Sequence, residues 1–274
     1  MKKKDTIDRN YLFGSAPVSS AVLTLVGPAI VSQLISLVYN LVDTYFLGRT
    51  NNPAMDAAVS LAFPSFLVMT AIGSLFGIGG NSCVARALGR RDEDYAKRAA
   101  AFSIITGAIV ICILCVAAGI FRNTILRLLG TDEATYIHTW NYLKWTFVFG
   151  GIPTVMSMIL SHLLRSEGYA KQAGFGLSMA GVLNIILDPL FMFVILAPGN
   201  EVEGAALATG LSNLASFVYF AALIIRHEEL TIVRVDFKHY KFDSAVAKEV
   251  FVVGLPSAAT HILSSCQMQC LITV

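Results

Sequence analysis

Seven long apolar stretches dominate this 274-residue sequence and limit what it can fold into. Each is long enough, at about 18 residues or more, to cross the roughly 30 Å hydrocarbon core of a membrane as a helix. Charged residues make up only 14% of the chain, against about 25% in a soluble domain, and they fall between the stretches. The sequence therefore predicts an all-α, polytopic transmembrane bundle. The stretches lie at residues 16–47, 55–83, 99–121, 136–164, 173–197, 204–225 and 245–274.

The basic residues are divided unequally between the two sides of such a bundle. If every stretch crosses, 16 of the 20 Lys and Arg residues lie on the side of the N-terminus. Basic residues favour the cytoplasmic side, so we predict a multi-pass protein of the plasma membrane with its N-terminus inside. The sequence has no basic, aromatic-rich face of the kind that binds nucleic acid. The other side holds only Arg49, Arg122, Arg127 and Lys144.

Prolines and glycines interrupt the apolar stretches. Pro28, Pro64 and Pro153 each remove a backbone hydrogen bond inside a predicted span, which leaves a static kink or a hinge as alternatives. Glycines crowd the end of the second span without the Lys-Ser/Thr of a phosphate-binding loop, so we expect close helix packing there. These glycines are Gly77, Gly79, Gly80 and Gly89.

Two acidic residues, Asp43 and Asp188, lie clearly inside predicted spans. A carboxylate there costs roughly 2.5–3.5 kcal/mol on insertion scales, which makes each a candidate functional residue. From the span ends, Asp43 is expected roughly 7 Å deep and Asp188 roughly 14 Å. Asn184 shares the helix face of Asp188, four residues earlier, and Thr209 lies near the outer end of the sixth span.

Carboxylate, amide and hydroxyl oxygens suit a small hard cation such as Na⁺, and buried carboxylates can instead take a proton. No other metal or cofactor is expected. Two plainer alternatives stay open. Asp43 could be an interfacial residue that reaches water, and Asp188 could form a helix-ending turn with Pro189.

A cytoplasmic connector is expected between the sixth and seventh spans. Residues 230–242 alternate partly between apolar and polar, and Asp243 or Ser244 is placed to cap the next helix. Gly27-Pro28 in span one and Gly254-Leu255-Pro256 in span seven form a weak internal repeat, as in transporters built from paired halves. We thus predict a six-helix lobe at 1–228, a connector at 229–243 and the first helix of a second lobe at 244–274, the whole being a fragment of a protein of about twelve spans.

Five motifs, in order along residues 17–270, resemble the MATE (multidrug and toxic compound extrusion) family, especially its bacterial MepA-like and DinF/NorM-like branches. They are YNLVDTYFLG at 39–48, RALG at 86–89, LRSEG at 164–168, LNIILDP at 183–189 and GAALAT at 204–209.

The resemblance implies twelve helices in two six-helix lobes, of which this chain holds the N-lobe and one helix of the C-lobe. It implies a monomeric antiporter in contact with membrane lipid, exporting cationic amphipathic drugs against Na⁺ or H⁺. It places the N-lobe cation site at Asp43, Asn184, Asp188 and Thr209, with Tyr39 and Tyr142 beside it and Pro28 as the bending proline of helix one.

Three other classes are weighed against this one. A lipid-linked oligosaccharide flippase of the same superfamily predicts a strongly basic cavity, and the spans offer only Lys144, near an outer end. A membrane-embedded enzyme is not supported by a His-Glu-x-x-His or Gly-x-Ser-x-Gly motif. A non-transporting scaffold would not need Asp43 and Asp188.

Overall fold

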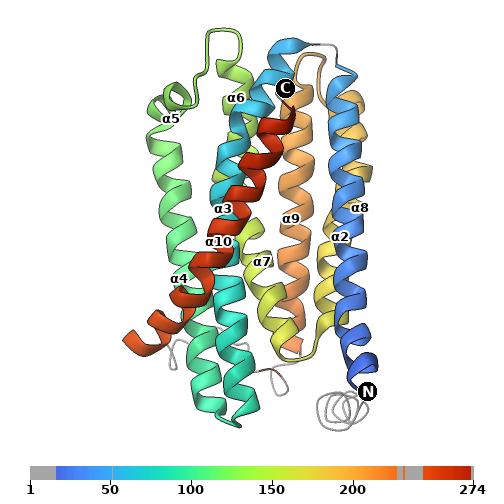
Figure 1. Cartoon of the computed structure of the whole chain (residues 1–274). Helices are drawn as coiled ribbons and strands as arrows, with labels where there is room; N and C mark the ends of the chain where they lie inside the picture. Colours follow the sequence, from blue (N-terminus) through green and yellow to red (C-terminus); the bar gives the residue numbers. More distant parts are fainter. Residues whose placement is uncertain (1–16, 51, 227–230, 232–242, 273–274) are drawn as a thin grey trace.

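The computed structural model describes residues 17–50, 52–226, 231 and 243–272, and every regular element within these residues is a helix. The helices form one elongated bundle, which α10 crosses obliquely (Figure 1). In chain order they are α2 (Val18–Gly48), α3 (Pro53–Gly89), α4 (Glu93–Ile120), α5 (Arg122–Leu128), α6 (Tyr136–Leu143), the π-helix η1 (Lys144–Phe149), α7 (Gly151–Ser166), α8 (Ala170–Leu190), the π-helix η2 (Phe191–Ile195), α9 (Glu201–Arg226) and α10 (Ser244–Ile272).

Most of the predicted spans correspond to helices that can cross a membrane. Five helical segments within the described residues are long and apolar enough to do so: Val26–Gly48, Pro53–Gly89, Glu93–Ile120, Ala170–Ile195 and Glu201–Arg226. The pair Tyr136–Phe149 and Gly151–Ser166, bent by 46°, counts as a sixth. The seventh predicted span forms α10, which is not among the candidate spans found within the described residues. The predicted fold class, a polytopic helical bundle, is confirmed.

Short polar side chains begin three of the long helices. Asn52, Asp92 and Asp243 each accept a backbone N–H from the first turn of α3, α4 and α10, at 3.1, 3.0 and 2.9 Å. Such caps satisfy donors that have no partner within the helix. The predicted cap at Asp243 is therefore confirmed.

The loop between α5 and α6 is ordered by one aspartate. The hydroxyl and the backbone N–H of Thr135 both donate to Asp132 Oδ1, at 2.6 and 2.9 Å. Because these bonds favour the ionised form, they hold the pKa of the Asp132 carboxyl below its usual value. The Asp132 carbonyl also accepts the N–H of Tyr136, at the start of α6.

Glycines allow α2 and α8 to pack closely. A Cβ at Gly174 would lie 2.8 Å from the carbonyl oxygen of Pro28, and one at Gly181 would lie 2.8 Å from Ile35 Cγ2. The two glycines are seven residues apart, so they lie on one face of α8. Small residues on a helix face permit this approach, and it brings the length of α2 against α8.

Three of the four glycines near the end of α3 pack as predicted. A Cβ at Gly77 would lie 2.8 Å from His162 Cδ2, one at Gly80 would meet Ser103 Oγ, and one at Gly79 would meet the Val250 carbonyl of α10. For Gly89 the prediction is wrong, because nothing lies within 4 Å of that position.

The prolines break the helices less than the sequence suggests. Pro28 and Pro64 lie inside the continuous helices α2 and α3. The bend in the fourth span lies at Gly150, just before Pro153, which is the third residue of α7. Pro189 also lies inside a helix, and the chain continues through it into η2. The alternative of a helix-ending turn at Asp188 is therefore wrong.

The connector at 229–243 lies largely outside the described residues. Within it, Thr231 is buried and its hydroxyl donates to Glu167 Oε2 at 2.8 Å, which ties the connector to the residue that follows α7. Glu167 itself is 1% exposed.

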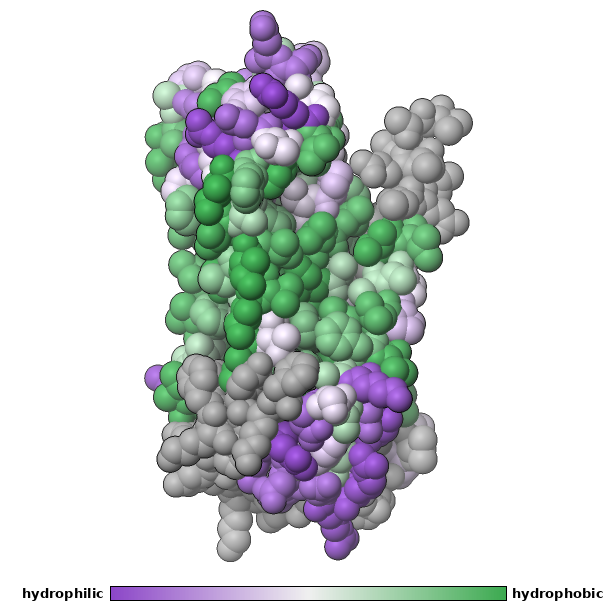
Figure 2. Space-filling model, turned by 90° about the vertical axis from the view of Figure 1, so that its left-hand side faces the viewer, coloured by the Kyte–Doolittle hydropathy of each residue, from purple (hydrophilic) through white to green (hydrophobic). Residues whose placement is uncertain are grey.

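A hydrophobic band lies between two hydrophilic ends of the bundle. Figure 2 shows it on the side where α4 and α5 lie. Large apolar side chains such as Leu23, Ile113, Ile120 and Ile225 are 61–72% exposed there and elsewhere on the bundle. A continuous band of this kind marks a surface that contacts lipid or protein rather than water.

Candidate cation site

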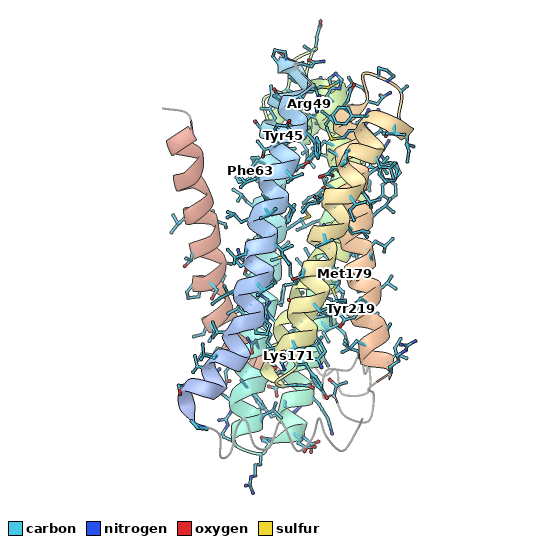
Figure 3. All side chains as sticks on the ribbon, turned by 90° about the vertical axis from the view of Figure 1, so that its right-hand side faces the viewer. Tyr45, Arg49, Phe63, Lys171, Met179 and Tyr219 are labelled. Carbon is cyan, nitrogen blue, oxygen red and sulfur yellow. The ribbon has the colours of Figure 1, made fainter. Side chains whose placement is uncertain are left out.

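The candidate site lies where α2, α8 and α9 meet. Asp43 is on α2, two residues before Tyr45, which Figure 3 places in the half of the bundle opposite Lys171. Asn184 and Asp188 are on α8, and Thr209 is on α9. Asp188 is 0% exposed and Asn184 is 3% exposed.

One amide joins three of these side chains. Asn184 Nδ2 donates to Asp188 Oδ1 at 3.0 Å and to Thr209 Oγ1 at 3.3 Å. The four-residue spacing of Asn184 and Asp188 puts both on one face of α8. The hydrogen bonds fix the Asn184 side chain with its nitrogen toward Asp188 and Thr209, so that its oxygen is left for another partner.

Three buried oxygens at this site have no hydrogen-bond partner among the described residues. They are Asp43 Oδ1, Asn184 Oδ1 and Asp188 Oδ2. A buried polar atom without a partner costs about 1–3 kcal/mol, and more when it is charged. All three are acceptors, so a cation, a proton or the O–H of a water molecule would satisfy them.

Asp43, Tyr39 and Tyr142 complete the surroundings of Asp188. Asp43 and Asp188 interact electrostatically, and each also interacts with both tyrosines. Asp43 is only partly exposed and its Oδ1 is buried, so the alternative of an interfacial residue reaching water does not describe that oxygen. Hydrogen bonds thus join Asn184, Asp188 and Thr209, and Asp43, Tyr39 and Tyr142 lie within electrostatic range of Asp188.

A second polar cluster lies beside the site, and the sequence did not predict it. Glu203 Oε1 accepts from Lys144 Nζ at 2.9 Å and from Trp145 Nε1 at 2.8 Å. Glu203 precedes Thr209 by six residues on α9, which is roughly 9 Å along the helix. The sequence did contain a signal for this cluster. Lys144 lies in the apolar fourth span, and Glu203 lies in the first turn of the sixth span.

The two π-helices hold α9 in place around Thr209. A Cβ at Gly204 would lie 2.9 Å from the Met192 backbone of η2, and one at Gly210 would lie 3.0 Å from the Trp145 carbonyl of η1. π-helical turns occur often at functional sites. Here η2 packs against α9 at Gly204 and η1 packs against it at Gly210, and Thr209 lies between these two positions in the sequence.

The donor set suits a hard cation. Two carboxylates, an amide oxygen and a hydroxyl are oxygen ligands of the kind that Na⁺ takes, whereas thiolates and imidazoles suit zinc or copper. No group of three or more His, Cys, Asp or Glu residues close enough to hold a metal ion occurs in the described part of the chain.

Comparison with known proteins assigns the fold to a family. The MatE family model matches residues 28–190. The chain belongs to the MatE family. The match covers Asp43, Asn184 and Asp188, and the MATE resemblance of the sequence is confirmed. Family members are transporters rather than enzymes, so the enzyme alternative is set aside.

Sequence relatives of this MatE chain are multidrug export proteins. MepA of Staphylococcus aureus strain MRSA252 is 31% identical over 253 residues, covering 92% of this chain and 55% of the relative. MepA of Staphylococcus haemolyticus is 30% identical over 247 residues, covering 90% and 53%. The chain therefore spans about half the length of the relatives it matches.

Solved MATE structures share the fold. A MATE protein in complex with MaD3S superposes with a TM-score of 0.84 at 26% identity, covering 95% of this chain and 57% of that one. An outward-facing multidrug resistance MATE transporter of the MOP superfamily gives 0.82 at 26% identity, with 95% and 56% covered.

Proposed function

We propose that this chain supplies the first six-helix lobe, residues 1–228, and the first helix of the second lobe of an ion-coupled multidrug exporter. The exporter would move cationic amphipathic compounds outward in exchange for Na⁺ or H⁺. Family membership and the multidrug-exporting relatives support the transport activity. The flippase alternative is not favoured, because Lys144, the basic residue that the sequence offered for it, is paired with Glu203.

The observation that carries the coupling role is the set of three unpartnered oxygens on Asp43, Asn184 and Asp188. Two carboxylates in one poorly solvated site cannot both remain ionised cheaply. A Na⁺ ion would be held by these oxygens with Thr209 Oγ1 beside them. A proton would instead be shared, and the two carboxyls would then titrate as a coupled pair.

Ion binding would drive export by stabilising one conformation over another. Loading the site neutralises it, and the conformation with the higher affinity for the ion becomes more populated. The shift can be no larger than the ion's difference in affinity between the two states. Pro28, on the face of α2 that packs against Gly174 of α8, is the proposed point at which α2 bends.

We propose that the protein lies in the plasma membrane with its N-terminus in the cytoplasm. The excess of basic residues on the N-terminal side supports it. The exporter is proposed to act as a monomer surrounded by lipid, with no cofactor besides the coupling ion.

Transport by vesicles tests this function. A complete two-lobe transporter that contains this chain is reconstituted, and efflux of a fluorescent cationic dye is followed under a Na⁺ gradient alone and an H⁺ gradient alone. One gradient should drive efflux, and Asp43→Asn or Asp188→Asn should each abolish the driven part. Asp56→Asn, at an exposed acid in the first turn of α3, is the matched control and should transport normally. Gradient-driven efflux that survives Asp188→Asn would contradict the proposal.

A further inference from the structure

A cavity of about 330 Å³ lies between α3, α4, α5, α6 and η1, apart from the cation site. Its volume is many times the roughly 30 Å³ share of one water molecule, so it has room for a chain of groups. Small side chains on one wall, Ala117 and Ala118 of α4, leave part of this space free. Trp140 and Leu143 of α6 also line the cavity.

The lining of the cavity is almost wholly apolar. Apart from Ser65 and Arg122, the residues that line it are Pro, Val, Leu, Ala, Ile, Trp and Phe. Ordered water needs two to four polar partners, which such walls do not offer. An apolar occupant gains the free energy of leaving water or of filling a void.

The cavity opens at the side of the bundle. Two of its lining residues, Val68 of α3 and Leu128 of α5, are 42% and 81% exposed. The side of the bundle where α4 and α5 lie carries a hydrophobic band below its hydrophilic end in Figure 2. An acyl chain in the membrane could therefore enter without first crossing water.

A cation stands at the mouth of the cavity. Arg122 begins α5 two residues after α4 ends, and its guanidinium lies 5.5 Å from the centroid of the Trp140 ring. Arg122 is exposed, and no acidic partner for it occurs in the described part of the chain. Arg and Trp at the end of a transmembrane helix mark the level of the lipid headgroups.

We propose that this cavity binds one acyl chain of a phospholipid whose anionic headgroup is held by Arg122. The apolar walls select the chain, and the unpaired guanidinium selects a negative phosphate-linked headgroup over a zwitterionic one. The lipid belongs to the leaflet at the end of the bundle opposite the N-terminus. The bound chain packs against α5 and holds this short helix beside α4 and α6. Its binding does not depend on the coupling ion.

The two tryptophans of the chain make a direct test possible, since Trp145 lies outside the cavity and Trp140 lines it. In the complete two-lobe transporter, Trp145 and every tryptophan outside this chain are changed to Phe. Trp140 fluorescence is then measured in vesicles of phosphatidylcholine and phosphatidylglycerol at a constant ratio. A fixed minor fraction of one lipid or the other carries bromine on its acyl chains. Brominated phosphatidylglycerol should associate about five-fold more strongly than brominated phosphatidylcholine, the preference that one basic residue near the surface gives.

Two variants and one control separate headgroup from chain. Arg122→Gln should bring the ratio of the two lipids to about one. Arg127→Gln, on the same helix but outside the cavity lining, should leave it unchanged. Ala118→Leu, which fills the cavity, should weaken quenching by both lipids. Equal quenching of the parent protein by both lipids overturns the proposal. So does an absence of quenching, which would show that another part of a longer protein covers the cavity.

Discussion

The amide nitrogen of Asn184 lies 3.0 Å from Asp188 Oδ1, while the second oxygen of that carboxylate, Oδ2, is buried without a partner. The same amide reaches Thr209 on α9. The Asn184 side chain therefore has two roles. It orients Asp188, and its own Oδ1 has no partner among the described residues, like Asp188 Oδ2 and Asp43 Oδ1.

Asn184→Leu should weaken binding of the coupling ion more than Thr209→Val. The leucine removes an oxygen ligand and the donor that orients Asp188, and loss of an orienting group at an ion site typically costs 10- to 100-fold in affinity. Thr209→Val removes one hydroxyl and should cost less. Ion-dependent thermal stabilisation of the purified protein measures both. Equal effects of the two variants would mean that Asn184 does not organise the site.

Pro28→Ala should lower turnover without loss of folded protein. Alanine restores the backbone hydrogen bond that Pro28 denies to α2 and so resists bending, while the contact with Gly174 is kept. Initial efflux rates and the amount of monodisperse protein are compared with those of Pro53→Ala. Pro53 is the first residue of α3, where a proline removes no intrahelical bond. Unchanged turnover in Pro28→Ala would leave only a static role for this proline.

The orientation can be tested with one cysteine at each end of the bundle. In a cysteine-free background, Asn200→Cys should react with an impermeant maleimide added outside intact cells, and Arg91→Cys should react only after the membrane is opened. Asn200 precedes α9, and Arg91 lies between α3 and α4. The reverse pattern would refute the assignment of the N-terminus to the cytoplasm.

Gly79→Ala should destabilise the contact between α3 and α10. A Cβ at Gly79 meets the Val250 carbonyl, and one at Gly254 meets the Leu75 carbonyl, so neither helix can give way at a flexible side chain. Overpacking of this kind costs about 1–3 kcal/mol. Gly89→Ala, ten residues along the same helix with nothing within 4 Å, should be nearly neutral. The melting temperatures of the two variants in detergent decide, and equal values would argue against the close crossing.

Much of the fold follows from the sequence because a membrane leaves few choices. Apolar length alone located the spans, and helix periodicity put Asn184 and Asp188 on one face. The four-residue spacing needs no knowledge of neighbouring helices. The sequence placed Asp43 and Thr209 only by their depth in the membrane. Whether they approach Asp188 depends on how α2 and α9 pack on α8. Gly174 and Gly181 permit the packing of α2, but the sequence alone does not predict it.

The cluster of Glu203, Lys144 and Trp145 could not be predicted from the sequence. Successive residues of an α-helix point about 100° apart, so Lys144 and Trp145 are not expected to share one partner. Both lie in the π-helical turn η1, and both donate to Glu203 Oε1. The bend at Gly150 rather than at Pro153 belongs to the same turn. The apolar pattern of residues 136–164 does not distinguish a π-helical turn from an α-helix.

The last prediction measures what this cluster contributes to stability. Lys144 and Glu203 are part-exposed, with side chains 29% and 20% accessible, so their pairing is worth less than that of a fully buried pair. Lys144→Met leaves the Glu203 carboxylate with only Trp145 as a donor and should lower the free energy of unfolding by about 1–2 kcal/mol. Glu203→Gln keeps an acceptor for Trp145 but leaves Lys144 without its counter-charge, so its cost should be similar or smaller. The double variant Lys144→Met/Glu203→Gln should cost less than the sum of the two single variants, because no unpaired charge remains. Chemical unfolding of the four proteins in detergent gives the coupling energy. Strict additivity would show that the 2.9 Å contact contributes nothing to holding η1 against α9.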